Sequence, residues 1–167
     1  MSKRPRQNTT RGTRRGATKL RGCADPTELS APAPGQSGHT SCHSACVACR
    51  EKAHGGLGLQ FRSESDGTLV AQFFCDPVNC SYPENVHGGH LALLLDAAMG
   101  HCLFEHGIIA VTGRLNIGYG EPVRVGQPAQ VRVAIHDHQE ELYRVRGEIV
   151  QAGRVCVRAE GKFTIRQ

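Results

Sequence analysis

The chain has 167 residues, eight cysteines and a formal net charge of +5. This length suits one domain with a core of its own. Residues 1–22 hold eight of the basic residues and no acidic one, so the rest has twelve basic against fifteen acidic residues and a charge of −3. The positive charge therefore belongs to a tail and does not make the folded part a nucleic-acid binder.

The cysteines and the hydropathy bear on the compartment. No apolar signal segment precedes the cysteines, and the chain is longer than most disulfide-dense secreted modules. We therefore expect reduced thiols and a cytoplasmic protein. No run of about eighteen apolar residues occurs, so we expect no membrane-spanning segment.

Residues 1–40 are predicted to be a disordered basic tail, followed by one folded domain over residues 41–167. The tail is rich in Arg, Thr, Gly, Ser and Pro and too poor in apolar residues to offset the entropy of ordering. An Arg-rich targeting peptide or a nucleic-acid-binding arm is one interpretation. A transit peptide is amphipathic, which this segment is not, so a solvated tail is the favoured interpretation.

Cysteines and histidines gather just before the first predicted strand. Cys46 and Cys49 have the C-x2-C spacing that lets two thiolates bind one zinc ion. Cys42 or His43, together with His54, would complete four ligands. The second closely spaced ligand pair of most zinc modules is missing. The alternative is a short turn that buries small thiols and needs no cofactor.

The next segments read as β-structure. Residues 57–62 and 68–75 are predicted strands, and the Ser65-Asp66-Gly67 turn between them makes a hairpin. Residues 76–86 are predicted to cross irregularly, because Pro77 and Pro83 oppose regular structure.

A helix is predicted from about Gly88 to Phe104, with Gly107 ending it. It is apolar on nearly every face, which is typical of a buried helix. Strands are predicted at 111–119, 129–136, 142–150 and 154–159, the last continuing through 162–166. Their half-polar alternation indicates an antiparallel sheet with one covered face, so the fold class is α+β.

The start of this helix is a candidate binding site. First-turn N–H groups have no partner within the helix, and the helix dipole is positive there. Gly88 and Gly89 permit close approach of a ligand, which favours an oxyanion pocket at the Gly88 N–H. The alternative is that the glycines only ease a tight crossing. His87 is a candidate acid, base or donor, or a residue that bonds only to backbone.

Asp96 is the one carboxylate inside the apolar helix, nine residues after His87. Small or apolar residues share its face and would let another helix or subunit approach: Gly89, Ala92, Leu93, Gly100 and Leu103. A carboxylate there suits a general base for water or a nucleophile on an acyl carbon. The alternative is a buried Asp that caps a backbone N–H.

Several segments together resemble one family, the hotdog-fold acyl-CoA thioesterases of the phenylacetate-pathway (4-hydroxybenzoyl-CoA thioesterase-like) superfamily. The resemblance spans residues 46–165, and His-Gly-Gly followed by an acid in an apolar helix is its most specific part. The matching segments are residues 46–49, 56–59, 82–83, 86–89, 94–96, 99–100, 111–119, Pro122, Gly126 and 159–163.

This resemblance implies one long central helix wrapped by a curved antiparallel sheet of about six strands. It also implies a homodimer, or a homotetramer built from two dimers, with two sites at the subunit interface and acyl-CoA as the substrate. The Gly88 N–H would polarise the thioester carbonyl, and Asp96 of the other subunit would be the general base or nucleophile. Thr112 would orient water or the carboxylate, and His87 would hold the loop or assist at the thioester.

The substrate-binding residues implied by the resemblance are Gly89, Ser81 and Asn85. Ser81 stands where related enzymes often carry an Asn or Gln that positions water, and Asn79 or Asn85 is a candidate substitute. This departure keeps a second hypothesis open, a non-catalytic acyl-CoA-binding hotdog protein that acts as a ligand sensor. Against it, residues 1–40 are too short and irregular for a folded DNA-binding module.

Overall fold

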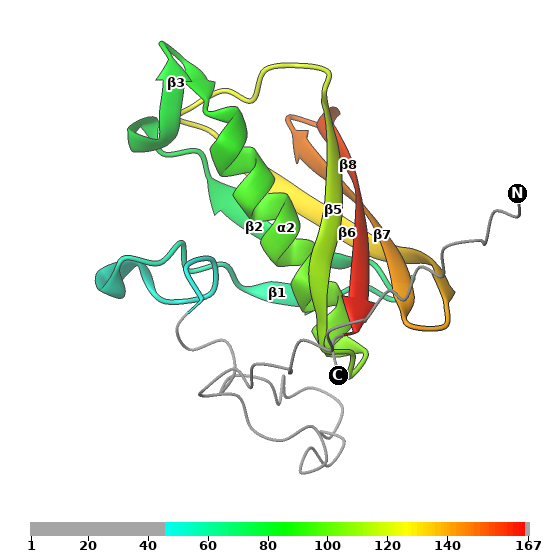
Figure 1. The fold of residues 1–167 in the computed structure, drawn as a ribbon. Coiled ribbons are helices and arrows are strands. Elements are labelled where there is room, and N and C mark those ends of the chain that lie inside the picture. Colours follow the sequence, from blue (N-terminus) through cyan, green and yellow to red (C-terminus); the bar gives the residue numbers. More distant parts are fainter. Residues whose placement is uncertain (1–45, 166–167) are drawn as a thin grey trace, which may run out of the picture.

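The computed structural model describes residues 46–165. The predictions for the basic tail at 1–40, and for Cys42 and His43, fall outside the described residues. One α-helix, α2 (Gly88–Glu105), lies against a six-stranded antiparallel sheet (Figure 1). None of the helices within residues 46–165 is long and apolar enough to cross a bilayer.

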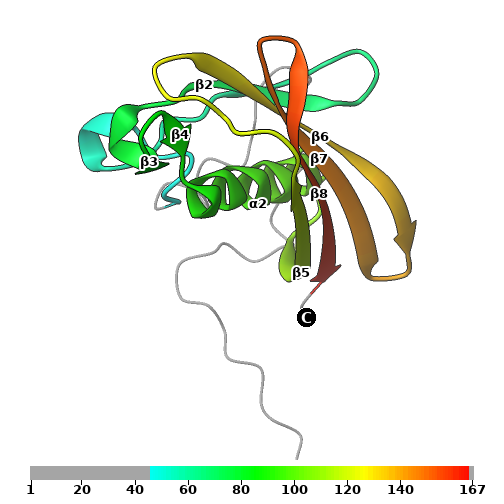
Figure 2. The ribbon, with the colours of Figure 1, turned by 90° about the horizontal axis from the view of Figure 1, so that it is seen from above.

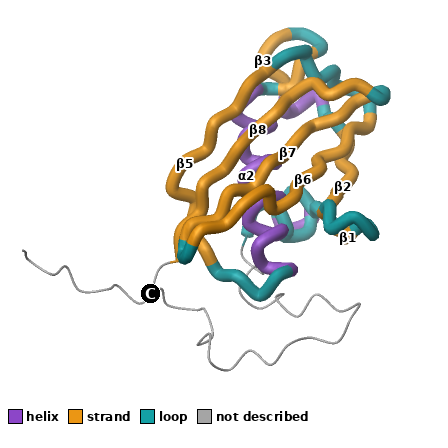
Figure 3. Tube along the Cα trace, turned by 90° about the vertical axis from the view of Figure 1, so that its right-hand side faces the viewer, coloured by secondary structure: helices purple, strands orange, loops and turns teal. Residues whose placement is uncertain are grey.

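The sheet has the order β1-β2-β6-β7-β8-β5, so β5 is an edge strand beside the C-terminal strand (Figure 3). A hairpin of β1 and β2 pairs onto β6, as the sequence predicts. The strands are β1 (Phe61–Ser63), β2 (Leu69–Phe74), β5 (Ala110–Tyr119), β6 (Pro128–Gln139), β7 (Leu142–Gln151) and β8 (Arg154–Ile165).

Two predicted segments differ from the structure. The strand expected over 57–62 begins only at Phe61, because Gly58 has φ +63° and the N–H groups of Leu57 and Leu59 bond back to Val47 and Ala48. The irregular crossing predicted over 76–86 is wrong in part. It contains a short 3-10 helix (Pro77–Asn79) and a two-stranded ribbon, β3 (Cys80–Tyr82) with β4 (Asn85–Val86).

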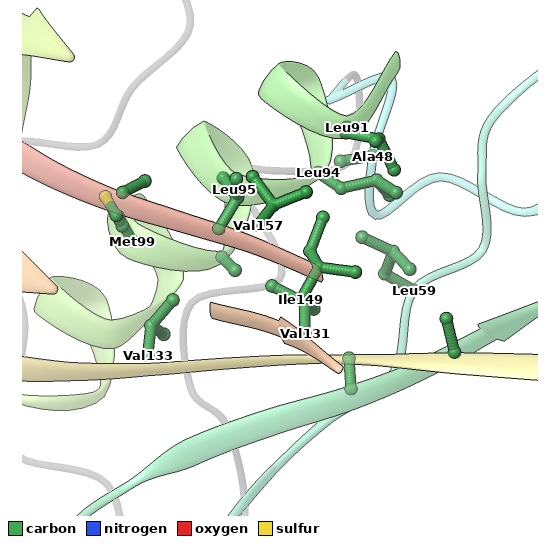
Figure 4. Packing of buried hydrophobic residues seen from close by; sticks show 14 of the residues in the cluster. Ala48, Leu59, Leu91, Leu94, Leu95, Met99, Val131, Val133, Ile149 and Val157 are labelled. Carbon is green, nitrogen blue, oxygen red and sulfur yellow. The ribbon is translucent and has the colours of Figure 1, made fainter. Parts of the chain in front are cut away.

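The sheet curves around one side of α2 (Figure 2), and the core fills the space between them. Close packing there depends on glycine at 161 in β8, because a Cβ would lie 2.5 Å from Phe163 and 2.8 Å from the Met99 sulfur. The central contacts join helix to strands (Figure 4): Leu94, Leu95 and Met99 with Val131, Val133, Ile149 and Val157.

Only one side of α2 is buried within the chain, although the sequence favours a helix buried all round. Seven of its residues are in the core, including Leu103, which is 1% exposed and so does not share the open face of Asp96 as expected. The opposite side carries half-buried small or apolar residues, Ala92, Leu93, Ala97 and Gly100, next to the edge strand β5.

Candidate functional site

Asp96 lies at the middle of the uncovered side of α2 and is half-buried. The Thr112 hydroxyl, on strand β5, donates a hydrogen bond of 2.7 Å to its Oδ1 atom. The partner of the carboxylate is therefore a side chain and not a backbone N–H, which removes the basis for a purely capping role. The pair stands on a face that the described part of the chain leaves accessible.

A β-bulge at Gly113 decides which way β5 presents its side chains. Thr112 pairs with Phe163 and Arg114 with Lys162, so one extra residue lies on the β5 side. In a regular strand without the bulge, Thr112 and Tyr119 would point to opposite faces, because they are seven residues apart and side chains alternate along a strand. The bulge turns both toward α2, where Thr112 meets Asp96 and Tyr119 meets Gly88.

The peptide between Gly88 and Gly89 is held at both ends. The Tyr119 hydroxyl donates to the Gly88 carbonyl at 2.9 Å, and the Gly89 N–H donates to Nδ1 of His87 at 2.9 Å. The preceding Gly88 N–H has no hydrogen-bond partner within residues 46–165. It is thus the open N–H of a helix start, where the dipole favours negative charge.

His87 is the N-cap of α2 and is exposed. Because its Nδ1 accepts from Gly89, the proton of the neutral ring is on Nε2, which faces outward as a donor. The His87 N–H donates to the Asn79 carbonyl at 2.8 Å, which fixes the loop before the helix. The helix start thus carries two N–H donors, one on the backbone of Gly88 and one on the His87 ring.

Asn79 and Asn85, the candidate substitutes for the amide that Ser81 replaces, lie close to this helix start. Both already make hydrogen bonds within the chain. The Asn85 Oδ1 atom accepts from Arg124 at 3.0 Å. Ser81 is exposed on β3. Asn79 reaches His87 through its backbone carbonyl. The sequence gives no signal for a role of Tyr119, because its contact with Gly88 depends on the bulge six residues away.

Asp96 and Gly88 do not meet within one chain. They are eight residues apart on one helix, which separates them by about 12 Å along its axis. A thioester carbonyl cannot touch both groups at that separation. Two hollows formed by residues 46–165, of about 450 and 570 Å³, lie on the outer face of β5, β7 and β8 and beside the β7–β8 turn. Neither borders Asp96 or Gly88.

The predicted zinc ligands are only partly brought together. His54 is exposed and pairs with Glu51 at 3.6 Å instead of meeting the thiols. Its place is taken by His101 of α2, whose Nε2 atom lies 2.7 Å from the Cys49 sulfur. Burial, together with the neighbouring Cys46 thiol, raises the pKa of Cys49 to about 12. Within residues 46–165, no three His, Cys, Asp or Glu side chains converge closely enough to hold a metal ion.

Comparison with known proteins gives a family model that matches part of the chain. Residues 84–158, which run from β4 into β8, match the model of the thioesterase superfamily. The matched stretch contains Gly88, Asp96 and Thr112 as well as Tyr119, so the candidate site falls within the shared part.

Solved structures show the same fold. A thioesterase superfamily protein superposes with a TM-score of 0.63 and 27% identity over 66% of this chain, which spans 57% of that protein. The E. coli PaaI protein from the phenylacetic acid degradation operon gives 0.66 and 22%, over 77% of this chain and 95% of that one. A hypothetical thioesterase from Streptococcus pneumoniae, solved with coenzyme A, gives 0.60 and 20%, over 65% and 88%. The expected hotdog fold is confirmed.

Proposed function

We propose that the protein is an acyl-CoA thioesterase, which hydrolyses a thioester to a carboxylic acid and free CoA. The observation that carries the proposal is the Thr112–Asp96 pair on the uncovered side of α2. The hydrogen bond orients a carboxylate within the stretch that matches the thioesterase superfamily model. Asp96 is not part of the hydrophobic core, so packing does not explain its presence. Structures with coenzyme A and with acetyl-CoA among the similar proteins support the choice of substrate class.

Asp96 acts as general base or as nucleophile. As a base, it takes a proton from water, and the resulting hydroxide attacks the acyl carbon. As a nucleophile, its oxygen attacks the acyl carbon and water then hydrolyses the anhydride. In both routes the bond between acyl carbon and sulfur breaks, and the CoA thiolate takes up a proton. Thr112 keeps one carboxylate oxygen in place, so the other oxygen faces the substrate.

The start of α2 stabilises the negative charge that develops on the thioester oxygen. The Gly88 N–H is open and lies at the positive end of the helix dipole, so it is the oxyanion donor. The His87 Nε2–H assists at the thioester. Gly89, Ser81 and Asn85 are the substrate-binding residues of this proposal; Gly89 is in the first turn of α2, Ser81 on β3 and Asn85 on β4.

The working unit of this proposal is a homodimer, alone or paired into a tetramer, in which Asp96 of one chain faces Gly88 of the other. The separation of about 12 Å within one helix requires a second chain if both groups act on one carbonyl. The half-buried small residues of α2 and the unpaired edge strand β5 are the surfaces that a second copy would cover. A cytoplasmic location remains part of the proposal.

The test is CoA release from a panel of acyl-CoAs by the full chain. We expect Asp96→Asn to lower turnover by about 10²- to 10⁴-fold, because an amide is neither base nor nucleophile. Asp137→Asn is the matched control, since Asp137 pairs with Arg144 on strands away from the site. Wild-type turnover in Asp96→Asn would show that the assigned mechanism is wrong. Binding of acyl-CoA without any release would favour the ligand-sensor hypothesis.

Mixing two inactive variants tests the shared site. Asp96→Asn and Gly88→Pro each damage both sites of their own homodimer. In a mixed dimer, one site receives both substitutions and the other receives none. Random mixing should therefore restore about a quarter of wild-type activity. Mixtures that stay inactive, despite exchange of subunits, would show that no site combines Asp96 of one chain with Gly88 of the other.

A further inference from the structure

Three basic side chains lie next to one another on the outer face of the sheet, the face turned away from α2 (Figure 3). In the strand register, Lys162 of β8 stands between Arg114 of β5 and Arg144 of β7. Phe163, the next residue of β8, is buried in the core, so Lys162 points to the opposite face. Directly opposed side chains have Cβ atoms about 5 Å apart, so this basic row spans about 10 Å.

The bulge at Gly113 puts Arg114 into the basic row. Thr112 and Arg114 are two residues apart and would share one face of a regular strand. The extra residue between them instead leaves Thr112 opposite Phe163 and Arg114 opposite Lys162. One irregularity thus turns Thr112 toward α2 and Arg114 toward the outer face.

The positive charges of the basic row are poorly balanced by the described residues. Like charges directly opposite each other destabilise a sheet. Arg144 pairs with Asp137 of β6 at 3.8 Å, whereas neither Arg114 nor Lys162 has an ion-pair partner among residues 46–165. That stretch holds eleven basic and thirteen acidic side chains, so the row is not the by-product of a basic domain. An anionic ligand would supply the missing counter-charge.

A hollow of about 450 Å³ adjoins the basic row on the same face. Gly118 of β5 leaves room in it, because a Cβ at this position would meet only the Arg158 carbonyl, at 3.9 Å. Asn116 joins the hollow to the row. It lines the hollow, and its Oδ1 atom accepts a hydrogen bond of 3.2 Å from the Nε–H of Arg114.

The charged side chains that line the hollow balance one another. Glu148 pairs with Arg158 at 3.1 Å, and Glu160 pairs with Arg146 at 3.4 Å. These acidic groups are therefore not free to neutralise the basic row, and the excess positive charge of this face is concentrated in the row. A neutral hollow beside three cations suits a ligand with an uncharged body and an anionic end.

We propose that the basic row and the adjoining hollow bind a nucleotide through its diphosphate group. Arg side chains bond to phosphate oxygens with paired N–H groups, and a Lys ammonium adds a compact charge. The ribose and base occupy the hollow, whose volume lies in the usual range of small-molecule sites. The nucleotide is either a free nucleoside diphosphate or the nucleotide end of an acyl-CoA. Only the second source rests on the proposed thioesterase function.

Titration calorimetry of the full chain with ADP tests the site, at about 50 mM salt because higher salt screens exposed charges. We expect about one ADP per chain, and clearly weaker binding of adenosine, which has no phosphate. Lys162→Gln should weaken ADP binding by about tenfold. Arg154→Gln is the matched control, since Arg154 is an exposed cation at the other end of β8, and it should bind ADP like the wild type.

The variant Lys162→Glu separates loss of binding from loss of folding. A carboxylate between Arg114 and Arg144 would face opposite charges, so this variant should resist urea at least as well as the wild type and yet bind no ADP. ADP or CoA binding by Lys162→Glu as tight as that of the wild type would overturn the proposal. Equal binding of ADP and adenosine by the wild type, or binding of neither ADP nor CoA, would overturn it as well.

Turnover identifies the source of the nucleotide. If the basic row holds the nucleotide end of the substrate, Lys162→Gln should raise KM for acyl-CoA by about tenfold at unchanged kcat. Hydrolysis of the matching acyl-pantetheine, which lacks the nucleotide, should then stay as in the wild type. If the row holds a free nucleotide, both substrates should be hydrolysed normally while ADP binding is weakened. Wild-type protein without turnover would contradict the thioesterase function and leave the ADP measurement unaffected.

Discussion

The two halves of α2 use their polar side chains in opposite ways. At the first turn, His87 and Tyr119 hold the Gly88–Gly89 peptide by its two polar atoms, and the Gly88 N–H has no hydrogen-bond partner within residues 46–165. Near the last turn, His101 and Cys49 point at each other and are enclosed by Phe61. The first arrangement holds a donor in position for a ligand from outside. In the second arrangement, two side chains of the protein contact each other, as in a structural contact.

The largest effect is expected from a variant that removes the Gly88 N–H at the first turn of α2. Gly88 is the first residue of α2, where proline is well tolerated, and His87 at ψ 131° suits a residue before proline. Gly88→Pro should therefore keep the helix and lower kcat by about 10²- to 10³-fold, the usual cost of one oxyanion donor.

Gly88→Ala is the matched control for that variant. It keeps the N–H but adds a Cβ at 3.3 Å from the Tyr119 ring, so it reports the steric effect alone. We expect Gly88→Ala to retain clearly more activity than Gly88→Pro in the CoA-release assay. Equal losses in the two variants would mean that crowding of Tyr119, and not the lost donor, explains the effect.

Substitution of Thr112 tests whether the middle of α2, like its first turn, takes part in catalysis. Thr112→Val removes the hydroxyl that donates to Asp96 at 2.7 Å and keeps the side-chain shape. We expect kcat to fall by about tenfold, since the carboxylate loses its orientation but remains present. Thr112→Ser should recover most of the turnover. If Thr112→Val changes only stability, the hydrogen bond serves packing between β5 and α2.

Substitution of Tyr119 tests how much the anchoring of the Gly88–Gly89 peptide contributes to stability and to kcat. Tyr119→Phe removes the hydroxyl that donates to the Gly88 carbonyl and leaves the ring over Gly88. We expect a loss of about 0.5–1.5 kcal/mol in the free energy of unfolding and a severalfold fall in kcat at unchanged KM. Urea unfolding and steady-state kinetics measure the two separately. A change in KM alone would make Tyr119 a substrate contact instead of a positioning residue.

The smallest expected effect concerns His90 in the first turn. Burial, and then the nearby His87, lower the pKa of His90 from 6.5. As pH falls below 6.5, the unfolded chain therefore binds a proton at His90 that the folded chain resists, and stability is lost as pH falls through the folded pKa. His90→Gln should show a weaker decline of unfolding free energy between about pH 7 and pH 5 than the wild type. His136→Gln, at an exposed site on β6, is the comparison.

Much of the fold was predictable because its signals are local. The apolar run and Gly107, at φ +73°, place the end of α2 within one residue of the prediction. Alternation in the four later strands gave their bounds to within a few residues. The short ribbon of β3 and β4 was missed, since its pairs bury little and its prolines suggest a loop.

The candidate site was predictable only in its residues. A carboxylate and glycines that interrupt an apolar pattern point to Asp96 and Gly88, and the resemblance to a family adds Thr112. The positions of these residues relative to one another were not predictable, because the bulge at Gly113 leaves no clear trace in the alternation of β5. The contact of His101 with Cys49 is not predictable for a similar reason, because the two residues are 52 positions apart in the chain.

The sequence by itself determined the elements of this protein and the chemical groups at the start and middle of the helix. Periodicity, caps and turns depend on residues close together in the chain, so the sequence is enough to locate the helix and the strands. Only the tertiary structure decided which face of β5 carries Thr112 and Tyr119, which side of α2 stays uncovered, and which histidine meets the thiols. Those outcomes depend on strand register and on packing between distant segments, where one residue of bulge reverses a side chain.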